Sequence, residues 1–299
     1  MSRIVAVANQ KGGVGKTTTT LNLAASLAAA GQRVLLIDVD PQGNLTSGVS
    51  LKGQAAPAGT VYHALTQVEP TLDARPFILT TRTTRLSLIP ADRNLTGAEI
   101  EMVPLDRREE RLRLLLQSIR AEYDYVFIDS PPSLGLLTLN ALVAADAVLI
   151  PLHCEYYALE GLADLWGTIR RVRGALNPSL DIEGVLFTMF DERTNLSQQV
   201  AAEVRAFFKE KVYRTTIPRN VRLGEAPSRG MPVIEYDPKS RGSEAYVALA
   251  REVLDVRLEL LRRLVALGGV APQSSQDDPL ELGRIVGHEA RGRRGVGVD

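Results

Sequence analysis

The sequence has one cysteine, no net charge and no long apolar run, and each absence excludes a class of protein. Cys154 is the only cysteine among 299 residues, so neither an internal disulfide nor a CxxC motif can form, as expected in a reducing compartment. Lysine plus arginine and aspartate plus glutamate both total 35, so net charge does not indicate an oppositely charged partner. No run approaches the roughly 18 apolar residues of a membrane span, and no signal peptide is visible. We therefore expect a cytoplasmic protein without a membrane segment.

Short apolar runs alternate with segments whose apolar residues recur at helical spacing, which is typical of βαβ units. The pattern predicts an α/β fold, with a doubly wound, mainly parallel sheet and helices on both faces. The expected strands are Arg3–Asn9, Arg33–Asp38, Leu86–Ala91, Tyr125–Asp129, Ala147–Leu152, Ile182–Phe190 and Val212–Pro218. The expected helices are Lys16–Ala30, Arg107–Ala121, Ala158–Ala175, Asn195–Glu210 and Ser243–Ala266.

The apolar patterning divides the chain into one domain and a tail. Residues 1–266 carry the strand and helix patterns, and we expect them to fold as one domain. Residues 267–299 are rich in Gly, Ser, Asp and Arg and have no sustained apolar face. We expect this segment to be a disordered tail.

The stretch "NQKGGVGKTT" follows the first expected strand and has the features of a phosphate-binding loop. Its glycines allow backbone N–H groups to surround phosphate oxygens, and the helix that begins near Lys16 directs its positive dipole end at the same anion. Lys16 supplies a point charge, and the Thr17 hydroxyl is placed to ligate Mg²⁺. The sequence therefore predicts a P-loop NTPase whose nucleotide contacts are Gly12, Gly13, Val14, Gly15, Lys16, Thr17 and Thr18.

The loop departs from the usual G-x-x-x-x-G-K-[ST] pattern at its start. Gln10 replaces the first glycine, and a second lysine, Lys11, follows it. One lysine is enough to reach the β- and γ-phosphates, so Lys11 needs another explanation. Without further information it could be an ordinary solvated loop lysine.

Three aspartates follow expected strands, at the carboxyl ends where open α/β sheets bind ligands. Asp38 and Asp40 lie in "LLIDVDPQGN", and Asp129 lies in "VFIDSPPS". We expect Asp129 to hold Mg²⁺ through water, Asp38 to support the metal site, and Asp40 to orient or deprotonate the attacking water. The alternative is that Asp38 or Asp40 only caps the turn before Pro41.

Five stretches together resemble the ParA/Soj family of DNA-partitioning ATPases, within the deviant Walker A group of P-loop proteins. They are "KGGVGKTT", "DVDPQGN", "FIDSPPS", "EYYALEG" and "IPRNVRLGEAPSRG", and the likeness extends from about Arg3 to Arg263. In the last stretch, Gly224 stands where the family more often has serine, and Arg229 where it more often has histidine. Neither difference puts an ATPase in doubt.

The resemblance implies a Mg²⁺-dependent ATPase of chromosome or plasmid segregation. Such a protein is expected to form a homodimer on ATP, to bind nonspecific double-stranded DNA on the nucleoid, and to be stimulated by a ParB/Spo0J-type centromere-binding protein. Lys11 would reach the nucleotide of the other subunit and act in catalysis together with Lys16 and Asp40. Pro218 and Asn220 would line the adenine pocket.

A local excess of basic residues is the main feature of the sequence itself that indicates DNA. Residues 211–230 hold five lysines and arginines and a single acidic residue, Glu225, and two more basic residues follow. Such a cluster can neutralise phosphates without reading bases. The alternative is ordinary solvated surface. The expected DNA contacts are Arg219, Arg222, Arg229, Lys239 and Arg241, with Arg219 and Arg222 close to the expected adenine pocket.

Related functions in the same P-loop group fit the sequence less well. Nitrogenase-like reductases need two cysteines per chain for a bridging iron–sulfur cluster, and this chain has one. Membrane-binding division-site regulators end in an amphipathic helix, and "LGRIVGHEARGRRGVGVD" has no apolar stripe. Tyrosine autokinases carry a terminal tyrosine cluster, whereas the last tyrosine here is Tyr246. A nucleotide-sensing scaffold without turnover stays possible.

Overall fold

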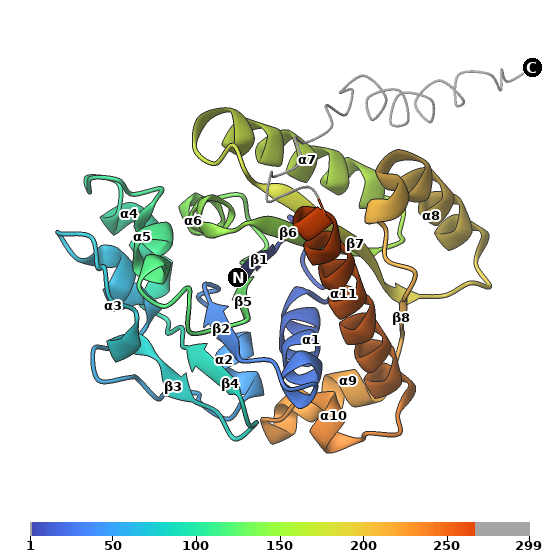
Figure 1. Ribbon diagram of the computed structural model, residues 1–299, viewed down its shortest axis with the longest axis horizontal. Coiled ribbons are helices and arrows are strands. Elements are labelled where there is room, and N and C mark those ends of the chain that lie inside the picture. The colour runs from blue at the N-terminus through green and yellow to red at the C-terminus, as the bar shows by residue number, and fades with distance from the viewer. Residues whose placement is uncertain (1, 267–299) are drawn as a thin grey trace, which may run out of the picture.

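The computed structural model describes residues 2–266, and in that part of the chain eight strands form one sheet (Figure 1). The strands are β1 (Arg3–Val7), β2 (Val34–Asp38), β3 (Leu79–Thr80), β4 (Leu86–Ile89), β5 (Tyr125–Asp129), β6 (Ala147–His153), β7 (Asp181–Phe190) and β8 (Ile217–Pro218). Their order across the sheet is β3-β4-β2-β5-β1-β6-β7-β8. Every neighbouring pair is parallel except β3 and β4.

Helices cover both faces of this sheet. The α-helices are α1 (Lys16–Ala29), α2 (Asn44–Gly48), α3 (Val61–Thr66), α4 (Leu95–Glu101), α5 (Arg111–Gln117), α6 (Leu136–Ala144), α7 (Ala158–Ala175), α8 (Asn195–Phe208), α9 (Val221–Glu225), α10 (Val233–Tyr236) and α11 (Arg241–Ala266). Short 3₁₀ turns are η1 (Arg75–Phe77), η2 (Lys209–Lys211) and η3 (Ala226–Arg229). No helix within residues 2–266 combines the length and the apolar character that crossing a membrane requires.

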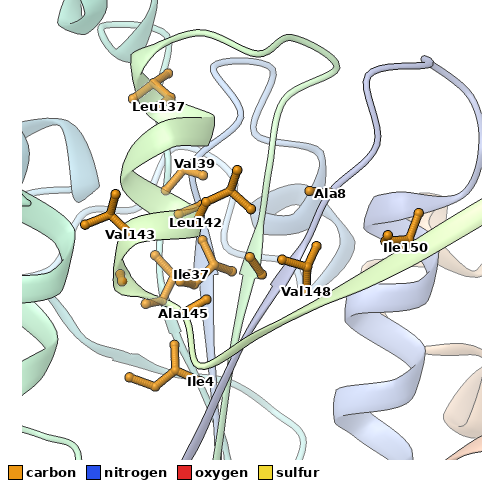
Figure 2. Close-up of a cluster of buried hydrophobic side chains, with 14 of the residues drawn as sticks. Ile4, Ala8, Ile37, Val39, Leu137, Leu142, Val143, Ala145, Val148 and Ile150 are labelled. Carbon is orange, nitrogen blue, oxygen red and sulfur yellow. The ribbon is translucent and has the colours of Figure 1, made fainter. Parts of the chain in front are cut away.

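The strands divide the core into two layers because successive side chains point to opposite faces of a sheet. In β1, Ile4 joins the cluster packed under α3 to α8, whereas its neighbour Val5 joins the cluster packed under α1 and α11. Figure 1 shows α1 and α11 side by side on their face. Figure 2 shows the opposite layer, where Leu142 and Val143 of α6 lie over Ile37.

The sheet order brings the two aspartate-bearing strands together. In the pairing of β2 with β5, Asp38 lies directly opposite Asp129, and in the pairing of β1 with β5, Val7 lies opposite Asp129. The phosphate-loop sequence begins two residues after Val7. The chain therefore places the loop and both carboxylates at one edge of the sheet.

The predicted fold class is confirmed, and the long predicted elements are present, but some boundaries are wrong. The strand expected at Val212–Pro218 is regular only at Ile217–Pro218, with one isolated bridge from Val212 to Val185, because the pairing of β7 with β8 is irregular. The helix expected from Arg107 begins at Arg111. The predicted tail, 267–299, lies outside the described residues.

Most of the elements that the pattern did not predict are short or buried on every side. For example, α2 has five residues and α3 six, too few to show a helical period. The nine residues of α6 are almost all buried, so this helix has no polar face to alternate with an apolar one.

Candidate active site

The phosphate loop has the backbone conformation that its glycines predict. Gly13 and Gly15 have φ angles of 71° and 85°, in the left-handed region that residues with a Cβ rarely occupy. Gly15 directly precedes α1, whose first residue is Lys16. The free N–H groups of the first turn of α1 therefore point into the loop, where they favour an anion.

Lys16 is largely buried against this loop, with 7% of its surface exposed. Its Nζ donates to the carbonyl oxygen of Lys11 at 3.0 Å. Burial lowers the pKa of Lys16, and the negative charges of Asp129 and Asp40 partly oppose that effect. The nearby carboxylates thus offset only part of the cost of burying the Lys16 ammonium. An additional negative group, such as a phosphate, would stabilise its charge further.

Asp129 is fully buried at the end of β5. The Thr20 hydroxyl donates to its Oδ1 at 3.0 Å, but its buried Oδ2 has no hydrogen-bond partner in the part of the chain that the structure describes. Burial, followed by the nearby Asp38 carboxylate, raises the pKa of Asp129 to about 8, although hydrogen bonds from Thr17 and Thr20 act in the opposite direction. A buried carboxylate with one unsatisfied oxygen beside another carboxylate is suited to a cation.

Asp38 is also fully buried, and its partners lie in the loop that follows β2 and in α2. Its Oδ2 accepts from the N–H of Thr46 at 2.8 Å and from the Thr46 hydroxyl at 2.7 Å, and its Oδ1 accepts from the N–H of Asp40 at 3.2 Å. Burial raises the pKa of Asp38 to about 6 against these hydrogen bonds.

Asp40 has 7% of its surface exposed, and its Oδ1 accepts from the N–H of Gln42 at 2.9 Å. Both aspartates therefore do cap the turn around Pro41, as the simpler alternative required. In this loop, capping uses only the Oδ1 atom of Asp40. The capping role of Asp40 is therefore compatible with a further role for its carboxylate.

The residues around the loop fit Mg²⁺, which prefers hard oxygen ligands and usually keeps several waters. The available groups are the Thr17 hydroxyl at the start of α1, the unsatisfied Oδ2 of Asp129, and the adjacent buried Oγ of Ser130, which also has no partner among the described residues. All are oxygen atoms. Thr17 and Asp129 are the residues that would hold the ion, with Asp38 beside them.

Lys11 is part of the loop, and its side chain is not free in solvent. Its Nζ forms a short ion pair with Oε2 of Glu155, whose Oε1 lies 2.8 Å from Nδ1 of His153. Its backbone N–H donates to Oδ1 of Asn9 at 3.0 Å, and the Asn9 amide in turn donates to the carbonyl of Pro151 at 2.8 Å. The two lysines therefore have different partners: the Lys11 ammonium pairs with Glu155, and the Lys16 ammonium contacts a loop carbonyl.

The residues expected near adenine lie at the end of β8. Asn220 uses its Oδ1 to accept from the N–H of Arg222 at 2.8 Å, which caps α9. Arg219 is close enough to affect other groups at this edge. Burial lowers the pKa of His153, and the Arg219 charge adds to that effect. The hydrogen bond from Lys11 lowers the pKa of Glu155, and the Arg219 charge again contributes. Arg219 therefore lies near the pair formed by Lys11 and Glu155.

The other basic residues divide into paired and unpaired ones. Arg222 contacts Glu225 at 2.7 Å and Asp237 at 3.2 Å. Pairing thus weakens the expectation that it contacts DNA. Within the described residues no ion pair involves the remaining three, which are all exposed: Arg229, Lys239 and Arg241.

Several residues of this site were not predicted from the sequence. Thr20 follows Lys16 by one helical turn, a spacing that could have indicated a shared face. Glu155 lies inside the stretch "EYYALEG" but had no assigned role. Thr46 and Thr188, which contact Asp38 and the phosphate loop, carry no local signal, because only the folded chain brings them to the site.

Comparison with known proteins agrees with this geometry. An AAA domain family matches residues 2–182. The chain is 56% identical to a chromosome partitioning protein ParA of Myxococcus xanthus over 254 residues, covering 85% of this chain and 88% of the relative. It is equally 56% identical to the sporulation initiation inhibitor protein Soj of Bacillus subtilis over 253 residues, covering 85% and 98%. Among solved structures, cobyrinic acid a,c-diamide synthase of Mycobacterium smegmatis with ADP and magnesium has a TM-score of 0.70 at 34% identity, covering 92% of this chain and 100% of that one.

Proposed function

Because the chain belongs to the ParA/Soj family of chromosome-partitioning proteins, we propose that it forms an ATP-dependent dimer that binds DNA without sequence preference. The protein is a P-loop ATPase of segregation, with ATP and Mg²⁺ as its cofactors. The proposal adds three features: the dimer, nonspecific DNA, and stimulation of hydrolysis by a ParB/Spo0J-type partner.

The residues of the loop and those of the strand ends have different roles in hydrolysis. Mg²⁺, when bound, neutralises charge on the phosphates. Lys16 and the N–H groups of the loop bind and orient the phosphates, and Thr17 and Asp129 hold the metal side of the site. Asp40, which lies in the loop after β2 beside Asp38, orients the attacking water and accepts its proton.

The main support for the proposed dimer is the position of Lys11. Lys16 already fills the place of the loop lysine, and the Lys11 side chain pairs with Glu155, the two side chains being 32% and 47% exposed. Two facing triphosphates repel one another strongly where water is excluded, so a cation from each chain that crosses the interface stabilises the dimer. The same charge stabilises the transferring phosphoryl group, as an arginine finger does. ADP recruits Lys11 less well, so the nucleotide controls assembly.

DNA binding is supported by the position of the unpaired basic residues. Arg229 lies in η3, Lys239 between α10 and α11, and Arg241 at the start of α11. Figure 1 shows α9, α10 and the first turn of α11 gathered at one end of the molecule. If each chain neutralises about three phosphates, log K against log salt has a slope of about −3 for a monomer and about −5 for a dimer. Dimerisation therefore turns weak binding into strong binding.

The test combines assembly with turnover. Light scattering with ATP, ADP or no nucleotide should show a dimer only with ATP. Lys11→Ala should bind ATP as a monomer and fail to dimerise, and a stable ATP dimer of this variant would exclude Lys11 as the contact between subunits. Steady-state ATPase is then measured alone, with plain DNA, and with DNA plus a candidate ParB-type protein. We expect the two additions together to stimulate more than the sum of each alone.

A nucleotide-sensing scaffold is the second candidate, because Asp40 and Asp38 already have capping roles. Single-turnover hydrolysis separates the two functions. Asp40→Ala should bind ATP and dimerise but hydrolyse about 10²-fold more slowly, the usual size of a lost general base. Turnover at the wild-type rate in this variant would remove Asp40 from the mechanism.

A further inference from the structure

A hydrogen bond connects the phosphate loop to β7, a strand that lies far away in the sequence. Thr188 of β7 is 2% exposed, and its hydroxyl donates to the carbonyl oxygen of Val14 at 2.8 Å. Val14 is itself buried, between the two left-handed glycines of the loop. This hydrogen bond joins residues 174 positions apart. Through it, a side chain of the sheet contacts a backbone carbonyl of the phosphate loop.

The bond determines which way one peptide group points. In a trans peptide the C=O of one residue and the N–H of the next point in opposite directions, and the described chain contains no cis peptide. A carbonyl of Val14 held toward β7 therefore directs the N–H of Gly15 away from β7, into the concave side of the loop. A loop that binds phosphate needs its N–H groups there and its carbonyls outside. Thr188 holds one carbonyl outside.

The rest of the Thr188 side chain limits movement of the same segment. A Cβ built on Gly15 would lie 3.7 Å from Cγ2 and 3.8 Å from Cβ of Thr188, which is ordinary van der Waals contact. The threonine therefore packs directly behind Gly15 while its hydroxyl holds Val14. Both parts of the side chain act on the Val14–Gly15 peptide.

An irregularity in β7 accompanies this placement. Met189 has a φ angle of 49°, a conformation that is costly for a residue with a Cβ. At this residue the pairing with β8 shifts, so that Thr188 lies opposite Ile217 and Phe190 opposite Pro218. The same short segment thus contacts the phosphate loop through Thr188 and the end of β8, the expected adenine side, through Phe190.

We propose that Thr188 is a positioning residue that sets the orientation of the Val14–Gly15 peptide for phosphate binding. It acts through the loop and does not touch the nucleotide. The inference rests on the nucleotide site described above but not on dimerisation or DNA. Failure of either of those would leave it unaffected.

The test compares two substitutions that separate the hydroxyl from the methyl group. Thr188→Val keeps the shape and removes the donor, whereas Thr188→Ser keeps the donor and removes the methyl group. Thr66→Val is the matched control, because the Thr66 hydroxyl donates to a carbonyl within α3, away from the loop. The dissociation constants of Mg·ATP and Mg·ADP are measured at equilibrium on the full chain, together with the melting temperature.

We expect Thr188→Val to weaken both nucleotides about tenfold, because the misoriented Gly15 N–H loses a hydrogen bond to a charged phosphate. Thr188→Ser should stay within about twofold of the wild type, and Thr66→Val should not change binding. Wild-type affinity in a folded Thr188→Val would overturn the proposal. If Thr188→Val does not fold, Thr188→Ser still decides: a tenfold loss there would show that packing, and not the hydroxyl, is what matters.

Discussion

The carboxyl edge of the sheet and the basic segment 211–241 contrast in how the chain treats charged groups. The charged groups at the edge are nearly or fully buried: Lys16, Asp38 and Asp129. The register of the sheet brings the two aspartates opposite one another. In the basic segment the cations lie at the surface, and their partners come from several elements. The sheet edge therefore holds its charged groups in the interior, whereas the basic segment keeps most of its cations at the surface.

Acidic partners far along the chain neutralise some of the cations of the basic segment. Lys211 pairs with Asp181 at 2.8 Å, and Arg214 contacts Glu252 at 3.5 Å. Neither acid lies within the segment whose charges were counted. Exposed pairs of this kind contribute little to stability, but they reduce the charge available to a phosphate. The remaining basic residues define the surface to test.

The largest expected effect lies at the buried edge. Lys16→Ala should abolish measurable ATP binding and reduce hydrolysis at least about 10²-fold, because no other buried cation contacts the loop in the described chain. Isothermal titration with Mg·ATP measures the binding. Lys52→Ala, which removes an exposed lysine, is the control. Wild-type affinity in Lys16→Ala would show that the loop does not bind the nucleotide as its pattern predicts.

Asp129→Asn should separate activity from stability. The variant should lose Mg²⁺-dependent hydrolysis by about 10²-fold, since the metal side of the site loses its carboxylate. Without Mg²⁺ and nucleotide it should melt about 2–5 °C higher than the wild type near pH 8, because a buried carboxylate beside Asp38 is no longer present.

The pH dependence gives the sign of this effect. The folded pKa of Asp129 is about 8 and lies above the unfolded value, so the folded protein binds the extra proton between about pH 4 and 8. Wild-type stability should therefore fall as pH rises through that range, and the advantage of Asp129→Asn should grow. A constant difference in melting temperature from pH 5 to pH 8.5 would contradict this account.

The basic surface should respond to charge reversal without a change in assembly. Arg229→Glu combined with Arg241→Glu should keep the ATP-dependent dimer and weaken DNA binding at least about tenfold, with a shallower salt slope, because two phosphate contacts per chain become repulsive. The matched control reverses Arg170 and Arg171, exposed on α7. Fluorescence anisotropy with plain duplex DNA measures both pairs. Equal losses in the two double variants would mean that net charge, and not this surface, governs binding.

The smallest expected effect concerns the pair that holds Lys11. Glu155→Gln removes the negative charge that attracts Lys11 within its own chain, so ATP should produce the dimer at a concentration lower by about two- to fivefold. The effect is small because both side chains are partly exposed and the pair is screened by salt. Glu122→Gln, which removes one of the two acidic partners of Arg75, is the control for a surface pair. A higher ATP requirement in Glu155→Gln would show that Glu155 assists the dimer.

The sequence by itself determined the fold class, the phosphate loop and the strand ends that carry the aspartates. These features depend on residues close together in the chain: apolar periodicity marks a buried strand, and the left-handed turns at Gly13 and Gly15 require glycine at those positions. The same locality explains why Lys16 and Thr17 could be assigned from spacing alone.

Only the tertiary structure decided which distant residues support the site. The order of the strands places Asp38 opposite Asp129, brings Glu155 to Lys11, and puts the Thr188 hydroxyl on the carbonyl of Val14. The last two contacts span 144 and 174 residues. The pattern along one strand does not specify its neighbours, because strand order is set by how the helices and both apolar faces pack together, and no local propensity records that choice.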